Sequence, residues 1–307
     1  MSIDPNPALV VLGATGAIGG AVVDAAVAAE RPVIAIARHA QALASLRERH
    51  PDADIVAIVA SVGSDGEAAA LARRLRELGR PLTGVVAAMR GECRRGRLLD
   101  QPAGFLRERL DEDLLPHLFA ARHLLPLLAE HDDGDVPGYV LIGGPGAQRP
   151  WAGYGHYSIG AAALQMLARV LHDEARALAV RVQLLAIDSP ARTDANARHA
   201  CNAWPGADSI ARRALDMLDR HDHQPTQAVV GYAAAQPPGF EPQSNDIDPA
   251  SGAVARAPSR ERPPPMPAQE PERQRDPLPA RCLQDARALL DQLGGPHPES
   301  NQEASPR

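Results

Sequence analysis

The chain has 307 residues, a net charge of −6 and an isoelectric point near 6.0, so its charge gives no reason to expect a nucleic-acid or anionic-membrane partner. No apolar run reaches the roughly 18 residues that a transmembrane helix needs, and residues 1–7 lack the basic start and apolar core of a signal peptide. Three widely spaced cysteines argue against a disulfide scaffold. We therefore expect a cytoplasmic protein, long enough for one large α/β domain plus an appendage.

Short apolar runs alternate with amphipathic helical stretches over residues 1–220. The expected buried strands are Leu9–Leu12, Val33–Ala37, Ile55–Ala60, Gly84–Ala88, Tyr139–Gly143 and Val180–Ile187. The expected helices include Gly19–Ala29, Ala68–Leu78, Phe105–Leu128, Ser158–Leu178 and Ser209–Leu218. This alternation predicts an α/β domain of the Rossmann type, with a doubly wound parallel sheet and helices on both of its faces.

The composition changes near residue 221. The remainder holds 16 of the 29 prolines and few large apolar residues, so residues 233–307 are expected to form a largely disordered tail. Two stretches of the segment after residue 221 are exceptions: residues 228–232 are expected to form a last edge strand, and residues 279–293 a short amphipathic helix. His221, Asp222 and His223 offer three short-range metal ligands without a fourth, so no metal site is predicted.

A glycine-rich turn follows the first strand. Leu9–Leu12 leads into Gly13-Ala14-Thr15-Gly16-Ala17-Ile18-Gly19, after which the first helix begins. Glycines permit a tight turn and a close backbone approach, and the helix amides then face a pyrophosphate. The pattern predicts a nucleotide site whose contact residues are Gly13, Thr15, Gly16, Ile18 and Gly19. A retained but empty turn is the alternative.

The second strand ends in Ala37-Arg38 rather than in a carboxylate. A carboxylate there would bind the ribose 2′-hydroxyl of NAD(H), whereas an arginine pairs with the 2′-phosphate of NADP(H). Arg38 therefore favours NADP(H) over NAD(H) as the cofactor. The alternative is a surface arginine that begins the next helix.

A downstream stretch carries a family resemblance over about residues 8–218. Gly138-Tyr139-Val140-Leu141-Ile142-Gly143-Gly144 is followed by Tyr154-Gly155-His156-Tyr157-Ser158. With the glycine turn, this resembles the fifth strand and the Tyr-x-x-x-Lys helix of the short-chain dehydrogenase/reductase family. In that family a serine orients the carbonyl, the tyrosine is the general acid/base, the lysine lowers the tyrosine pKa and holds the nicotinamide ribose, and an asparagine completes the proton relay. The resemblance also implies that Thr193 contacts the nicotinamide amide.

Most catalytic positions of that family are replaced in this chain. Tyr157 matches the tyrosine, but Gly144 stands for the serine, Ala161 for the lysine and Asp113 for the asparagine. All 32 basic residues are arginine, so no lysine elsewhere substitutes. An unperturbed tyrosine has a pKa of about 10, which leaves roughly one in a thousand ionised at pH 7. Alcohol oxidation would then lose most of its base, and carbonyl reduction would lack the serine donor, worth on the order of 10²–10³ in rate.

Three histidines and one aspartate are candidate replacements for the missing groups. His156 adjoins Tyr157 and has a suitable pKa range, but neighbouring residues at a helix start point in different directions. Asp113 either relays a proton through water or caps a buried turn. His117 and His123 are expected at a subunit contact or on the surface.

Three functions compete. The replacements favour a catalytically impaired pseudoenzyme that binds NADP(H), an unknown small molecule or a partner subunit. The alternative is a diverged NADP(H)-dependent carbonyl or oxoacyl reductase with Tyr157 as proton donor, and a third reading is a non-redox enzyme using His156 or Asp113. The resemblance implies a homo-oligomer, or a heteromer with an active relative, paired through Phe105–Leu128 and Ser158–Leu178.

Overall fold

The computed structural model describes residues 6–91, 95–130, 136–151, 153–219 and 227–232. All of them belong to one compact unit, Met1–Phe240. The expected tail over residues 233–307, its helix over residues 279–293 and the His221-Asp222-His223 cluster lie outside the described residues. None of the described helices is long and apolar enough to span a membrane.

Seven parallel strands form one sheet in the order β3-β2-β1-β4-β5-β6-β7. The strands are β1 (Ala8–Leu12), β2 (Val33–Ala37), β3 (Ile55–Val59), β4 (Leu82–Ala87), β5 (Gly138–Ile142), β6 (Arg181–Ala186) and β7 (Val229–Gly231). The strand order reverses between β1 and β4, which is where open parallel sheets bind ligands at their carboxyl ends. The predicted doubly wound parallel sheet is confirmed.

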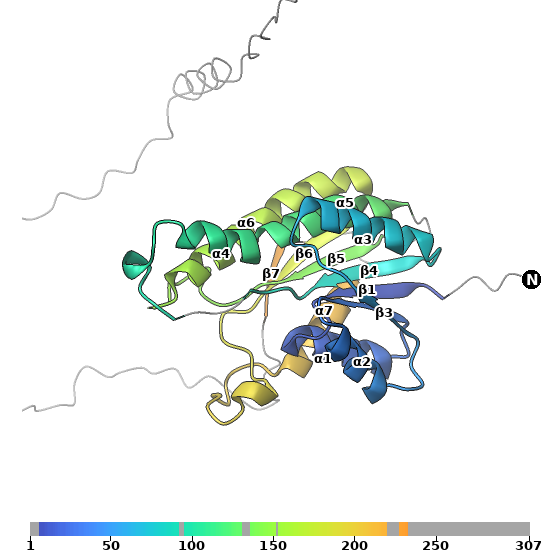
Figure 1. Ribbon diagram of the computed structural model, residues 1–307, viewed down its shortest axis with the longest axis horizontal. Helices are drawn as coiled ribbons and strands as arrows, with labels where there is room; N and C mark the ends of the chain where they lie inside the picture. The colour runs from blue at the N-terminus through green and yellow to red at the C-terminus, as the bar shows by residue number, and fades with distance from the viewer. Residues whose placement is uncertain (1–5, 92–94, 131–135, 152, 220–226, 233–307) are drawn as a thin grey trace, which may run out of the picture. The chain divides into compact units, whose positions relative to one another are not determined.

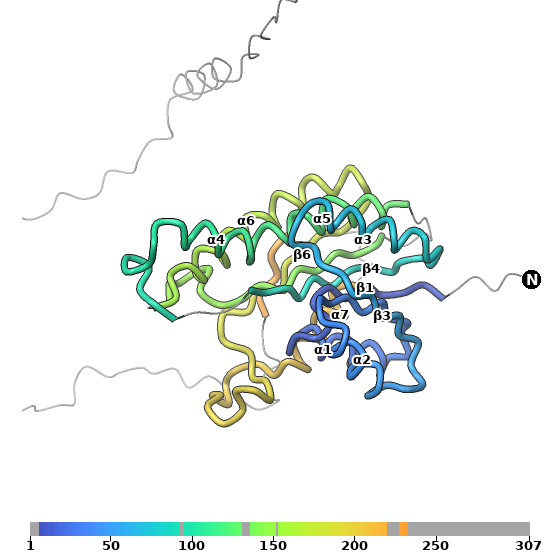
Figure 2. Tube along the Cα trace, in the orientation of Figure 1, coloured from blue at the N-terminus to red at the C-terminus, as the bar shows by residue number. Residues whose placement is uncertain are grey.

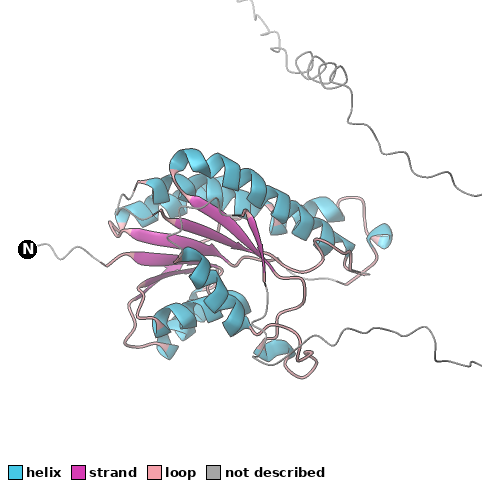
Figure 3. Cartoon of the chain, turned by 180° about the vertical axis from the view of Figure 1, so that it is seen from behind, coloured by secondary structure: helices cyan, strands magenta, loops and turns pink. Residues whose placement is uncertain are grey.

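Helices cover both faces of the sheet (Figures 1 and 3). One face carries α1 (Ala17–Ala28), α2 (Ala40–Arg49) and α7 (Ala207–Leu218); the other carries α3 (Asp65–Glu77), α4 (Phe105–Asp113), α5 (Leu115–Ala129) and α6 (Gly155–Ala175). Alternate residues of each strand therefore serve two apolar cores. In β1, Leu9 and Val11 pack with the first group, and Val10 and Leu12 with the second.

The expected single helix over Phe105–Leu128 is wrong, because the structure divides it into α4 and α5 at Leu114. Pro116 lies in the first turn of α5 and lacks the N–H that a continuous helix would need. Both α4 and α5 remain on the same face of the sheet, and the chain path in Figure 2 places α4 beside α6. The break leaves Asp113 at the end of α4, where its side chain reaches the segment after β4.

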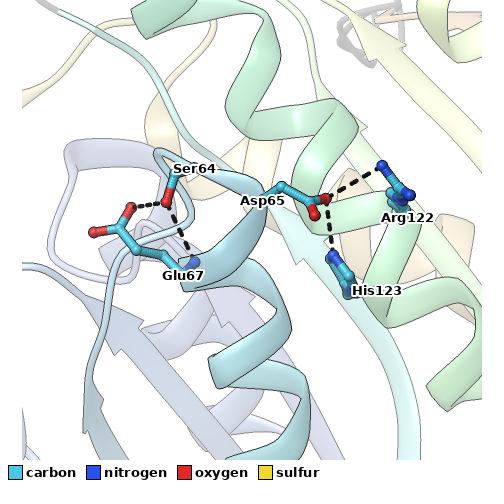
Figure 4. A network of polar contacts seen from close by, with 5 residues as sticks. All are labelled: Ser64, Asp65, Glu67, Arg122 and His123. Atoms are coloured by element: carbon cyan, nitrogen blue, oxygen red, sulfur yellow. Dashed lines mark hydrogen bonds and ion pairs between the residues drawn. The ribbon is translucent and has the colours of Figure 1, made fainter. Parts of the chain in front are cut away.

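A polar network joins α3 to α5 (Figure 4). Ser64 caps α3 by accepting the Glu67 N–H at 3.3 Å, and its own hydroxyl donates to the Glu67 carboxylate. The Asp65 carboxylate lies 2.9 Å from Nε2 of His123 and 3.5 Å from a guanidinium nitrogen of Arg122. These contacts fix the start of α3 just beyond the loop that follows β3.

Candidate functional site: two adjoining cavities at the carboxyl ends of the strands

The glycine turn between β1 and α1 is built by close backbone contacts. Gly13 has a φ of +77°, and a Cβ atom there would lie 2.5 Å from the carbonyl oxygen of Ala88. A Cβ on Gly19 would lie 2.7 Å from the carbonyl carbon of Gly13 and closer still to its oxygen. Gly16 is the N-cap of α1 and supplies no side-chain acceptor, so the first amides of α1 have no cap. The turn thus brings bare backbone and a helix N-terminus to the sheet edge, as a phosphate requires.

A large cavity of about 870 Å³ extends from this turn across the ends of β2, β3 and β4. That volume lies in the range of cofactor and small-molecule sites. Its lining includes the predicted contact residues Gly13, Thr15, Gly16, Ile18, Arg38 and Thr193. Gly19 is absent from the lining, and its role in this structure is to let α1 pack against the Gly13 backbone.

Arg38 follows β2 directly and borders the large cavity with its side chain exposed. Within the described residues it makes no hydrogen bond or ion pair, and the residue before it, Ala37, contributes no carboxylate. At the other side of the cavity, the N–H of Thr193 donates to Oδ1 of Asn196 at 2.8 Å. The large cavity is therefore bordered, directly after β2, by a guanidinium that has no partner among the described residues.

A small cavity of about 90 Å³ adjoins the large one, and Ile18, Ala88, Met89, Arg90, Pro145 and Ala191 line both. Tyr157, from the first turns of α6, lies in its wall with only 8% of its surface exposed. The Arg90 guanidinium carbon lies over the Tyr157 ring, 4.2 Å from the centroid. The Trp151 ring stacks on the same tyrosine, with centroids 5.9 Å apart.

Gly144 and Ala161 stand where the family resemblance predicts a serine and a lysine, and both line the small cavity. Ala161 lies one turn after Tyr157 on α6 and lines the small cavity with a methyl group. Gly144 also lines it, and a Cβ there would lie 3.0 Å from Cζ of Tyr157 and closer still to the phenol oxygen. Position 144 therefore has no room for a side chain while Tyr157 keeps this conformation.

Asp113 and His156 lie in different surroundings. The Asp113 carboxylate accepts the Gly91 N–H at 2.7 Å and lines the small cavity; burial raises its pKa, and the Gly91 N–H and the charges of Arg109 and Arg90 partly offset this. His156 is 3% exposed, packs edge-on against Phe105 and lines neither cavity. Burial lowers the pKa of His156. Asp113 is thus placed to affect a ligand, and His156 is placed to pack α6 against α4.

His117 is the site residue that the sequence did not reveal. It was expected at a subunit contact or on the surface, but it is 1% exposed and lines the small cavity. Burial lowers its pKa to about 4, partly opposed by a hydrogen bond to the Met89 backbone, so the ring is neutral at pH 7. Helical spacing from Asp113 could not have found it, because the chain breaks at Leu114 between α4 and α5.

The comparisons with known proteins agree with this architecture. The family model described as short chain dehydrogenase matches residues 7–204. No curated protein is significantly similar to the chain. Among solved structures, a short-chain dehydrogenase from Streptomyces avermitilis is 24% identical with a TM-score of 0.62, over 74% of this chain and 89% of that one.

Two further solved structures are named with a bound nucleotide. ElxO with NADP bound is 12% identical with a TM-score of 0.65, over 74% of this chain and 96% of that one. An NADPH-bound short chain oxidoreductase from Pseudomonas aeruginosa PAO1, described as containing an atypical catalytic center, is 21% identical with a TM-score of 0.61, over 70% and 91%. At these identities the likeness concerns the fold.

Proposed function

Because the chain belongs to the short-chain dehydrogenase family, we propose that its large cavity binds NADP(H) and that the protein is a catalytically impaired member of that family. The observation that carries the cofactor preference is Arg38, which directly follows β2, has no partner among the described residues and has no carboxylate beside it in the sequence. The two neighbours named with bound NADP or NADPH support the cofactor class.

The residues present fit the nucleotide. The Gly13 and Gly16 backbone forms a tight turn in which a Cβ atom at either position would press against a carbonyl oxygen, of Ala88 or of Gly13. This backbone would approach the pyrophosphate, and the uncapped amides of α1 would donate to it. Arg38 would hold the 2′-phosphate, and Thr193 would contact the nicotinamide end. When bound, NADPH supplies a hydride.

The impairment follows from the small cavity. Its lining has Gly144 and Ala161 where a hydroxyl donor and a cation would act on the carbonyl and on the phenol. Losing one preorganised donor alone costs on the order of 10²–10³ in rate. We expect the protein to bind the nucleotide but to turn over substrate slowly. It would then act through a bound nucleotide, metabolite or partner subunit.

Titration of NADPH and NADH by calorimetry tests this proposal. We expect NADPH to bind in the micromolar range and more tightly than NADH, with Arg38→Ala removing most of that preference. Absence of binding by both nucleotides at millimolar concentration would refute the proposal.

A diverged carbonyl reductase is the second candidate, and the position of Tyr157 favours it. The phenol lies in the wall of the cavity that adjoins the cofactor cleft, beneath a permanent positive charge on Arg90. A screen of carbonyl compounds with NADPH, comparing the protein with Tyr157→Phe, decides between the two candidates. Turnover abolished by Tyr157→Phe would establish the reductase, and turnover that persists in that variant would exclude Tyr157 as its proton donor.

Self-association through α6 is part of the proposal. Ile159, Met166 and Val170 are 39%, 57% and 44% exposed and follow one another at intervals of seven and four residues. Such spacing puts three apolar side chains on one face of the helix. A second copy of the chain, or an active relative, would cover that face.

A further inference from the structure

Arg90 is the only arginine that lines the small cavity among the described residues. It comes from the segment after β4 and borders both cavities, so it stands at their junction. His117, the other basic side chain of the lining, is neutral at pH 7 because burial lowers its pKa to about 4. The small cavity therefore has one permanent positive charge, at its boundary with the cleft proposed for the nucleotide.

Among the described residues, none accepts a hydrogen bond from the Arg90 guanidinium. Its guanidinium carbon lies 4.2 Å from the centroid of the Tyr157 ring, which supports the planar group from one side. The described residues offer it no hydrogen-bond acceptor and no ion pair. A guanidinium carries five N–H donors in a planar fork that matches a carboxylate, and two parallel N–H bonds to one carboxylate are a preferred arrangement.

The acidic side chain of the cavity does not take this role. Asp113 accepts the Gly91 N–H at 2.7 Å, and it makes no ion pair with Arg90. Burial raises the Asp113 pKa, which lessens its repulsion of a second carboxylate. The remaining lining is mostly apolar, with Met89, Ile142, Leu164 and Ile187, and leaves room only for a ligand of a few heavy atoms.

We propose that the small cavity binds a small oxo acid, whose carboxylate is held by Arg90. The proposal rests on the proposed function for its choice of a carbonyl compound, because NADPH would occupy the adjoining cleft. The carboxylate requirement rests on Arg90 alone and holds whether the bound acid is reduced or only sensed.

Pyruvate and methyl pyruvate test the proposal, since the ester keeps the carbonyl group but lacks the charge. Each is titrated by calorimetry into the full-length protein, with and without saturating NADP⁺. We expect pyruvate to bind about 10-fold or more tightly than the ester, as a charge-assisted hydrogen bond implies. Arg90→Gln should remove that preference.

Arg149→Gln is the matched control. Arg149 is also an exposed arginine without a partner among the described residues, but it lines neither cavity, so this variant should keep the preference for pyruvate. Equal affinity for both probes in the unmodified protein, no pyruvate binding, or an unchanged preference in Arg90→Gln would each overturn the proposal. If Arg90→Gln has a lowered melting temperature, the comparison of pyruvate with methyl pyruvate in the unmodified protein still shows whether the cavity prefers a carboxylate.

Titration of NADP⁺ into the same proteins distinguishes a failure of the oxo-acid site from a failure of the proposed cofactor site. NADP⁺ binding without a preference for pyruvate would overturn the oxo-acid site and leave the cofactor site standing. A preference for pyruvate without NADP⁺ binding would support the oxo-acid site and overturn the cofactor site. Weaker NADP⁺ binding in Arg90→Gln, with the pyruvate preference intact, would reassign Arg90 to the nucleotide and overturn the proposal.

Discussion

Adding a side chain at position 144 should destabilise the protein through Tyr157. In Gly144→Ala the new Cβ atom would lie 3.0 Å from Cζ of Tyr157 and closer still to the phenol oxygen, which is nearer than real Cβ contacts occur. Gly144 follows β5 and Tyr157 belongs to α6, so relief requires the tyrosine ring to move. Movement would disturb its contacts with Arg90 and Trp151.

The expected cost is about 1–3 kcal/mol of unfolding free energy, the usual penalty for overpacking a filled site. Loss of the cation–π contact with Arg90 would account for roughly 0.5–1 kcal/mol of that cost, the usual value for an exposed guanidinium. For a domain of this size each 1 kcal/mol lowers the melting temperature by about 2–4 °C. Gly144→Ser should behave in the same way, so restoring the family's serine alone should not restore the family's catalysis.

Denaturant unfolding of Gly144→Ala, Tyr157→Phe and the double variant measures the coupling between the two sites. The cost of the alanine should fall in the Tyr157→Phe background, where the phenol oxygen is gone. Gly160→Ala is the control, because a Cβ on that α6 glycine would meet nothing within 4 Å and should be neutral or stabilising. A Gly144→Ala protein as stable as the unmodified one, or a cost independent of Tyr157, would refute the reasoning.

Three further predictions concern the turn, the buried histidine and assembly. Gly19→Ala should cost more than about 1 kcal/mol in denaturant unfolding and weaken nucleotide binding, since its Cβ would overlap the Gly13 carbonyl; unchanged stability and binding would contradict this. The pKa of His117 is lowered to about 4 in the folded protein from 6.5, so its neutral form stabilises the fold fully above about pH 6.5 and that stabilisation declines as the pH falls toward 4, by about 3 kcal/mol. His117→Gln should flatten that pH dependence, and an equally steep profile in the variant would show that other groups cause it. Met166→Glu, on the exposed face of α6, should lower the mass measured by light scattering if that face pairs two copies, whereas an unchanged oligomer would place the interface elsewhere.

The elements that the sequence predicted well are those whose signal is local. Five-residue runs such as Val33–Ala37 are apolar throughout because both faces of a parallel strand are covered, and β2 has those bounds in the structure. The glycine turn was also predictable, since a tight turn between a strand and a helix depends on the residues within it. The break at Leu114 had a local signal as well, Pro116, which helical periodicity alone did not capture.

The features that the sequence did not reveal depend on contacts between distant segments. The burial of His117 results from how α5 packs against the segment after β4, where Met89 provides its hydrogen bond. The stacking of Arg90 on Tyr157 joins residues 67 positions apart, and the lack of space at Gly144 depends on the tyrosine conformation. The residue types at positions 144 and 161 indicate that a hydroxyl and an ammonium group are missing. Only the tertiary contacts show which side chains surround Tyr157 instead.

The central claim is that the large cavity binds NADP(H) and that Arg38 binds its 2′-phosphate. Comparing the binding of 2′,5′-ADP with that of 5′-AMP tests this claim most directly. The two ligands differ only in the 2′-phosphate and do not reach the altered catalytic positions. We predict that 2′,5′-ADP binds at least about 10-fold more tightly than 5′-AMP and that Arg38→Ala abolishes the difference. Equal affinities in the unmodified protein, or a difference that survives Arg38→Ala, would contradict the account.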